Sequence, residues 1–250
     1  MKLSKLAPLV PAAMLLCATA QADDGWSGEG SLSAGYTTGN TETTDLGLGL
    51  DIKRTAGVWS LGVEAQADYG ETDNVENKNR YFLASELDRQ INDRMFGFGR
   101  VSYETDEFSG FDSRLFAGVG LGYLALDSEA TKWSLRGGPG IKIDEVKPYI
   151  ADVNGVPTFF PAETQESFSV IGSSEFSHAF NDAVSISNNT DLLYAQESTQ
   201  IGNVLALTAS LTNTLSARFS FDVRHDTNPP PGFEATDTAT RIALVYSIGG

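Results

Sequence analysis

Hydrophobic side chains occupy every second position along most of the chain after residue 25. In residues 59–69, WSLGVEAQADY, one parity holds Trp, Leu, Val, Ala and Tyr, and the other holds polar or small residues. A period of two places these sets on opposite faces of a β-strand. Residues 31–50, SLSAGYTTGNTETTDLGLGL, also keep their apolar side chains on alternate positions, although their composition is that of a linker. The pattern predicts strands almost throughout.

Twelve alternating segments follow one another, at residues 26–36, 45–53, 59–69, 80–91, 95–104, 114–123, 132–143, 168–180, 184–194, 201–211, 218–224 and 241–248. Short turns and longer loops connect them alternately; the turns lie near residues 55–56, 92–94, 128–130, 181–183 and 214–216, and the loops include 70–79, 146–165 and 227–237. This arrangement is typical of outer-membrane barrels. The sequence therefore predicts an all-β fold, a 12-stranded antiparallel transmembrane β-barrel with up-and-down meander order and both termini periplasmic.

Turn lengths agree with this register. Outward-facing Ile91 and Met95 require a connection with an odd number of residues, because paired residues of a hairpin face the same way. Phe180 and Val184 impose the same requirement on the turn at residues 181–183. Three-residue turns, which are common in hairpins, meet both requirements.

Aromatic residues gather at the two ends of the predicted strands. The loop-side ends carry Tyr36, Tyr69, Tyr81, Tyr103 and Tyr194, and the turn-side ends carry Trp26, Trp59, Tyr123, Trp133 and Tyr246. Two such bands are what the two interfaces of a membrane select. A secreted β-sandwich that serves as a binding module is the alternative, because its strands also alternate around a buried core. The two bands favour the barrel.

The first 22 residues have the features of a secretory signal peptide. Two lysines precede an apolar run, residues 6–16, that is too short to cross a bilayer as a helix. The sequence ATAQA then supplies small residues before the expected cleavage after Ala22. We therefore expect residues 1–22 to be removed and residues 23–250 to form the barrel.

Charge and motifs argue against several classes of function. The net charge is −16, so nucleic acid is not expected as a partner. No motif for a metal or another cofactor is recognisable, and none is expected. The outward-facing His178 has its nearest serine on the same face at Ser174, about 13 Å away at strand rise, too far for a catalytic pair. We do not expect an enzyme.

Four motifs carry a family resemblance: GYTTGNTETT, YETDEFSGFDSRLFAGVGLGY, GGPG and PPPGFEATDT. With them the chain resembles the salt-induced outer membrane protein family, which consists of Gram-negative barrels of unknown function. The resemblance implies a location in the outer membrane but no substrate and no catalytic residues. Lipid, lipopolysaccharide and, during biogenesis, the barrel assembly machinery are then the expected partners, and we expect a monomer.

Charged residues of both signs fall on the predicted inner face. The candidate lumen-lining residues are Asp51, Glu64, Arg80, Glu86, Arg100, Arg114, Arg136 and Arg224. They fit a narrow channel for small polar solutes or ions. They also fit a closed structural or envelope-stress barrel, in which the same charges fill the lumen as a network.

Small inward residues favour the channel, and large inward residues favour the closed barrel. Inward glycines such as Gly118, Gly120 and Gly122 leave space that favours water, whereas inward Phe96 and Phe98 favour filling. The loop 146–165 carries two consecutive phenylalanines beside prolines. It could fold into the mouth of the barrel or serve as a contact site.

Overall fold

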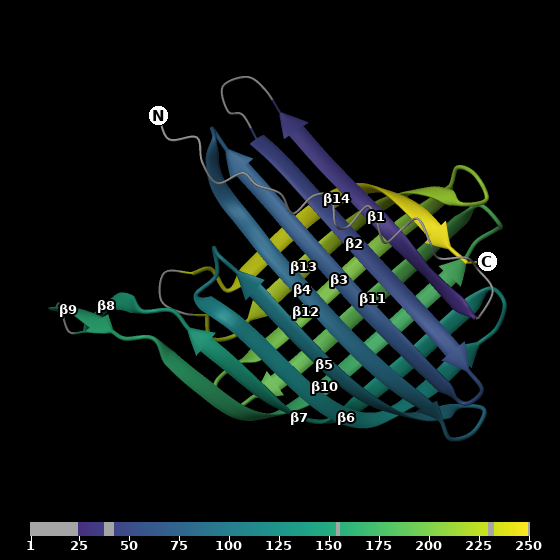
Figure 1. The fold of residues 1–250 in the computed structure, drawn as a ribbon, viewed down its shortest axis with the longest axis horizontal. Helices are drawn as coiled ribbons and strands as arrows, with labels where there is room; N and C mark the ends of the chain where they lie inside the picture. Colours follow the sequence, from purple (N-terminus) through teal and green to yellow (C-terminus); the bar gives the residue numbers. More distant parts are fainter. Residues whose placement is uncertain (1–24, 38–42, 154–155, 230–232, 250) are drawn as a thin grey trace.

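Twelve strands of the chain close into one barrel, and two further strands form a separate hairpin (Figure 1). The structure is a computed structural model that describes residues 25–37, 43–153, 156–229 and 233–249. The barrel strands are β1 (Trp26–Thr37), β2 (Thr43–Ala56), β3 (Trp59–Thr72), β4 (Val75–Gln90), β5 (Met95–Asp106), β6 (Phe111–Asp127), β7 (Thr131–Val146), β10 (Glu163–Ala179), β11 (Val184–Ala195), β12 (Thr199–Ser210), β13 (Leu215–Asp226) and β14 (Thr236–Ile248). The expected signal peptide, residues 1–22, lies outside the described residues.

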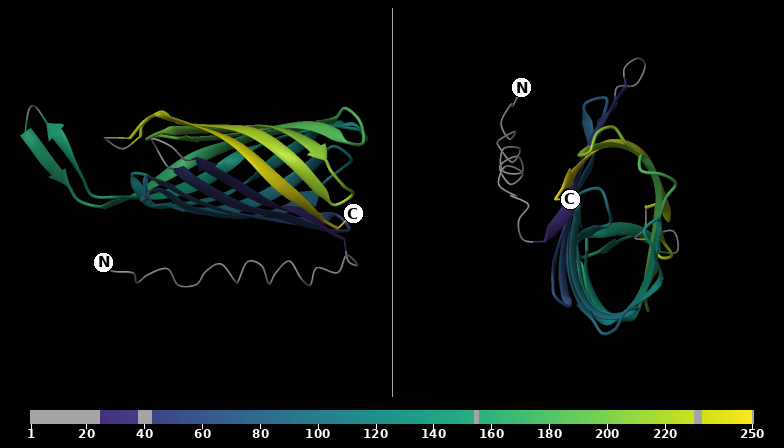
Figure 2. Two further views of the ribbon diagram at one scale, coloured as in Figure 1. Left: turned by 90° about the horizontal axis from the view of Figure 1, so that it is seen from above. Right: turned by 90° about the vertical axis from the view of Figure 1, so that its right-hand side faces the viewer.

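Each barrel strand pairs antiparallel with its neighbours in the chain, and β1 pairs with β14 to close the sheet. The closing seam is short: it joins six residue pairs, from Gly28 opposite Ile248 to Ser33 opposite Ala243. Viewed along its axis, the barrel has an oval outline (Figure 2). The predicted all-β, 12-stranded antiparallel transmembrane barrel with meander order is confirmed. The alternative of a β-sandwich is wrong, because one closed sheet replaces two packed ones.

Strand boundaries differ from the predicted ones mainly at the ends. The segment 70–79 is not a long loop, because β3 and β4 continue to a two-residue turn at Asp73 and Asn74. Both turn residues have positive φ, 51° and 62°, as a tight type I′ hairpin turn requires. The first and last short turns lie at residues 57–58 and 211–214. The three-residue turns after Ile91 and Phe180 have the predicted register.

The loop 146–165 forms the second sheet, a hairpin of β8 (Tyr149–Val153) and β9 (Val156–Phe160). Figure 2 shows that this hairpin projects away from the barrel rather than folding into its mouth. Tyr149 stacks on Phe160 with ring centroids 4.9 Å apart, whereas Ile150 and Phe159, a cross-strand pair, are both exposed. The lumen is therefore not plugged by this segment.

The outer face of the barrel is apolar, and the exposed large side chains follow the predicted parity. Leu83, Val101, Leu121, Ile141 and Phe168 are each more than half exposed, as are many residues level with them on other strands. Burying such a surface in lipid is favourable, whereas exposing it to water is not. No helix in the described part of the chain is long and apolar enough to cross a membrane.

The inner wall of β5, β6 and β7 is packed rather than open. Phe96 lies opposite Gly122 and Phe98 opposite Gly120, and both phenyl rings are almost fully buried. A Cβ added at Gly122 would lie 2.1 Å from the Phe96 ring, so the ring covers the glycine directly. Phenyl rings that cover cross-strand glycines stabilise a sheet. The space that these glycines leave therefore holds aromatic rings, not water as the sequence suggested.

We predict that Gly120→Ala lowers the free energy of unfolding by about 1–3 kcal/mol, because overpacking forces the wall apart. Its Cβ would lie 2.2 Å from the carbonyl oxygen of Gly137 and 2.7 Å from the Phe98 ring. Urea unfolding of the barrel in lipid vesicles measures the effect. Gly202→Ala is the matched control, because nothing lies within 4 Å of its Cβ. Equal stabilities of the two variants would contradict the packed wall.

Candidate functional site

The lumen is the candidate site, because charged side chains from most strands converge there. Direct cross-strand neighbours face the same side of a sheet. By this rule Asp51 faces inward with Glu29 and Glu64, which it pairs with on either side. Of the other candidate residues, Glu64, Arg80, Arg100, Arg114, Arg136 and Arg224 line cavities in the barrel, and Glu86 contacts two of these arginines. The eight candidate residues therefore share one face.

Arg80 is the centre of a buried ion cluster toward the loop end. Its guanidinium donates two hydrogen bonds to the carboxylate of Glu104, with N–O distances of 2.9 and 3.1 Å. It also donates to Asp68 at 3.3 Å and to the amide oxygen of Gln66 at 3.2 Å. The side chains of Arg80 and Asp68 are only 8% and 9% exposed. β4 thus supplies one cation to two carboxylates on its neighbouring strands β3 and β5.

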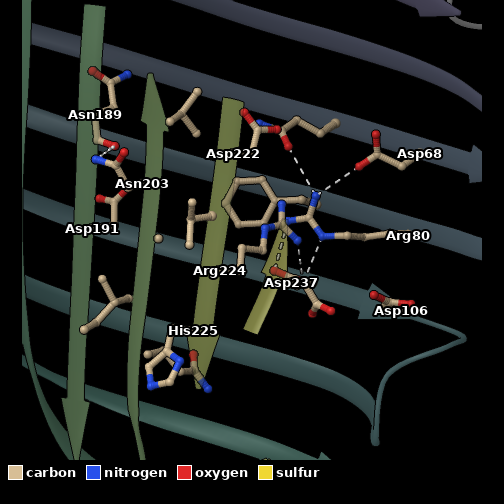
Figure 3. A pocket seen from close by; sticks show the side chains of 18 of the residues that line it. Asp68, Arg80, Asp106, Asn189, Asp191, Asn203, Asp222, Arg224, His225 and Asp237 are labelled. Atoms are coloured by element: carbon tan, nitrogen blue, oxygen red, sulfur yellow. Dashed lines mark hydrogen bonds and ion pairs between the residues drawn. The ribbon is translucent and has the colours of Figure 1, made fainter. Parts of the chain in front are cut away.

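Other ion pairs in this region cross the lumen (Figure 3). Arg224 of β13 reaches to 4.0 Å from Glu104 of β5, and these two strands lie on opposite sides of the barrel. Arg114 of β6 lies 3.5 Å from Asp226 of β13. Arg241 of β14 bridges Asp222 at 3.1 Å and Asp68 at 3.6 Å. The pairs Arg224–Glu104 and Arg114–Asp226 thus tie opposite walls of the barrel together, and Arg241 links its neighbouring strand β13 to β3.

A second group of charges, which we call the central belt, consists of Glu64, Glu86, Arg100, Arg136 and Glu175. Glu86 lies between the two arginines, with Arg136 at 3.1 Å and Arg100 at 3.7 Å. Arg100 also contacts Glu64 at 3.3 Å, and Arg136 contacts Glu175. The belt runs along the inner wall from β3 to β10.

The belt separates two cavities. The larger, of about 690 Å³, lies toward the loop end and is lined by Glu64 and Arg100, among others. The smaller, of about 470 Å³, is lined by Arg136 and Glu175. Ser187 and Asn189 on β11 line both cavities. The lumen is thus wide enough for water and small solutes on either side of a constriction that faces β11.

Sequence reasoning missed several members of the network. Asp144 forms an ion pair with Lys142 at 2.6 Å in which both side chains are 5% exposed. Asp226 accepts from Gln200 as well as pairing with Arg114. Both aspartates continue the inward parity of their strands just beyond the predicted ends at residues 143 and 224. Extending the alternation through polar strand ends would have found them.

His178 takes part in contacts between neighbouring strands, and His225 shares a hydrogen bond of 2.8 Å with Thr236. His178 shares a hydrogen bond of 2.8 Å with Thr131 on the adjacent strand, and its ring lies edge-on to Phe180. Ser174 instead accepts a hydrogen bond from the indole of Trp133 at 3.0 Å. Among the residues that the structure describes, no group of three or more His, Cys, Asp or Glu side chains converges to hold a metal ion.

Comparisons with known proteins concern family and fold. Residues 30–248 match the sequence profile of a family described as "Protein of unknown function, DUF481". No curated protein sequence matches the chain.

Several solved structures have a similar fold. The translocator domain of the autotransporter NalP from Neisseria meningitidis has a TM-score of 0.50 at 10% identity and covers 94% of this chain and 92% of that chain. The NanC porin has a TM-score of 0.49 at 13% identity, and the KdgM porin 0.45 at 12%; each comparison covers 88% of this chain and 98% of the porin. At such low identities the likeness concerns the barrel alone.

We predict that Arg80→Ala lowers the free energy of unfolding by about 3–5 kcal/mol, because Asp68 and Glu104 lose their closest and most buried cation. Only the longer contacts with Arg241, at 3.6 Å, and Arg224, at 4.0 Å, then remain. Lys78→Ala is the control: its pair with Asp45 is shorter, 2.7 Å, but the two side chains are 41% and 54% exposed. An exposed pair contributes at most about 1 kcal/mol. Urea unfolding in lipid vesicles compares the two. A larger loss for Lys78→Ala would show that burial does not decide the strength of these pairs.

Proposed function

The chain belongs to the DUF481 family, whose function is unknown, and we propose that it is a narrow outer-membrane channel for small polar solutes or ions. The observation that carries the proposal is the pair of cavities on either side of the central belt. Both are lined by charged and polar side chains. Polar linings of this kind support passage of hydrated solutes.

The width of the lumen limits what could pass. Twelve strands enclose less space than the 16 to 18 of the large porins and more than the eight of filled barrels. The ion pairs that cross the lumen, such as Arg224 with Glu104, subdivide this space further. Ser187 and Asn189 on β11 line both cavities, so we place the passage between them along β11. Such a passage suits ions and small solutes.

The orientation in the membrane follows from the ends of the strands. Trp26 and Ile248 lie at the end with the short turns, since Trp26 pairs with Arg54 next to the turn at 57–58 and Gly28 pairs with Ile248. Outer-membrane barrels have their short turns on the periplasmic side. We therefore place both termini in the periplasm and the β8–β9 hairpin outside the cell. We also propose that the protein is a monomer surrounded by lipid and lipopolysaccharide, and that the barrel assembly machinery inserts it.

A closed structural barrel is the second candidate, and one observation favours it. Phe96, Phe98 and Phe116 fill the inner wall of β5 to β7, and Glu86, 12% exposed, lies between two arginines. If water does not pass the belt, the same network would serve stability alone. Membership of the salt-induced outer membrane protein family, which would suit an envelope-stress role, stays a prediction.

Conductance separates the two candidates. We predict stepwise single-channel currents when the purified, refolded barrel is added to a planar lipid bilayer. Arg136→Ala should raise the conductance of each step, because it removes the guanidinium that joins Glu86 to Glu175 in the belt. Arg54→Ala is the control, because Arg54 lies over the ring of Trp26 near the turn end of the outer face. Silent wild-type barrels, folded as judged by heat-modifiable migration, would favour the structural role.

A further inference from the structure

We infer that this lumen selects cations, and that Asp51 and Asp191 at the central constriction are the residues that determine the selectivity. The inference rests on the proposed channel function and names the class of solute that it admits. It follows from the placement, pairing and exposure of the carboxylates around the belt.

Three carboxylates form a row across neighbouring strands. Asp51 of β2 lies directly opposite Glu29 of β1 in one ladder and directly opposite Glu64 of β3 in the other. All three therefore project from the same face at adjacent positions. Like charges directly opposite each other destabilise a sheet. The arrangement is costly unless cations offset it.

Among the described residues, direct ion pairs reach only the two outer members of the row. Arg218 forms a two-pronged ion pair with Glu29, and Arg100 lies 3.3 Å from Glu64. Within the described part of the chain, Asp51 has neither an ion pair nor a hydrogen bond through its side chain, although it is exposed to the lumen. Lys53 and Arg218 lie within electrostatic reach of Asp51. Because neither forms an ion pair with it in the described structure, water and dissolved cations also share in balancing its charge.

The facing wall contributes further negative charge. Asp191 on β11 lines the larger cavity, is exposed, and likewise has no side-chain ion pair or hydrogen bond among the described residues. Glu175 on β10 lies opposite Asn189, one of the two residues that line both cavities. Asp51 and Asp191 each lie within electrostatic reach of both Glu64 and Glu175, and Asp191 also lies within reach of Arg100 and Arg136. Carboxylates therefore outnumber cations around the passage.

At this level three carboxylates are more exposed than the guanidiniums, whereas Glu86, at 12%, is the exception, and Arg218 is 27% exposed. The side chains of Glu175, Glu29 and Glu64 are 45%, 36% and 32% exposed. Those of Arg136 and Arg100 are only 14% and 24% exposed, and Arg136 lies over the ring of Phe96. The charge that a passing ion meets at the constriction is thus negative.

Exposed cations lie above and below the central belt along the barrel axis. Arg224, 44% exposed, belongs to the ion cluster toward the loop end, and Lys53, 47% exposed, lines the smaller cavity. Carboxylates also outnumber arginines among the residues that line the larger cavity. Rings of Asp and Glu side chains are a feature of cation channels, and low-dielectric walls strengthen their field.

The test is the reversal potential of single channels with 1 M KCl on one side of the bilayer and 0.1 M on the other. We expect the wild-type barrel to pass potassium several times more readily than chloride. Asp51→Asn combined with Asp191→Asn keeps the side-chain size and should bring the permeability ratio close to one. Asp93→Asn combined with Glu129→Gln is the control: it removes the same charge from two exposed turns and should leave the ratio unchanged.

The outcomes separate the inference from the function it rests on. A folded wild-type barrel that never conducts overturns both the channel and its selectivity. A conducting barrel that prefers chloride, or a lumen variant that keeps the wild-type ratio, overturns the selectivity alone. An equal loss in the turn variant also overturns it, because surface charge at the mouth would then account for the preference.

Discussion

Closure of the sheet is the constraint on which the rest of this structure depends. Lipid offers no hydrogen-bonding partners to a backbone, so a sheet in a membrane must leave no open edge. The pairing of β1 with β14 meets this demand, although their ladder is short. Once the sheet is closed, strict alternation places every second residue in the lumen. The ionic interior is therefore a consequence of the same pattern that makes the outside apolar.

The lumen balances charge in two ways. Toward the loop end, Arg80 and Arg241 pair with carboxylates from several strands in a cross-linked cluster. Near the middle, the arginines are less exposed than most of the carboxylates, and Asp51 and Asp191 have no direct side-chain partner among the described residues. The first arrangement ties opposite walls of the barrel together. The exposed carboxylates near the middle leave an electric field in the lumen that the cross-linked cluster keeps open.

The sequence showed which face of the sheet each residue occupies, but it did not show how high along the barrel axis each residue lies. Alternation alone assigned all twelve strands and the inward face of the candidate residues, because the period of two is a local property. The pairing of Arg224 with Glu104 depends on strand number, tilt and curvature, which bring opposite walls together. Segment 70–79 was misjudged because its strands are polar, and hydrophobic alternation stops where a strand leaves the membrane.

The unpaired Asp51 bears on the choice between a channel and a purely structural barrel. A network that served stability alone would gain from an arginine paired directly with Asp51 or from an uncharged residue between Glu29 and Glu64, since either would relieve the repulsion in the row. The same lumen satisfies Arg80 with three partners, so the fold is able to pair its charges closely. Carboxylates that have no direct partner among the described residues are a stability cost, and conduction of cations through wetted space gives that cost a function.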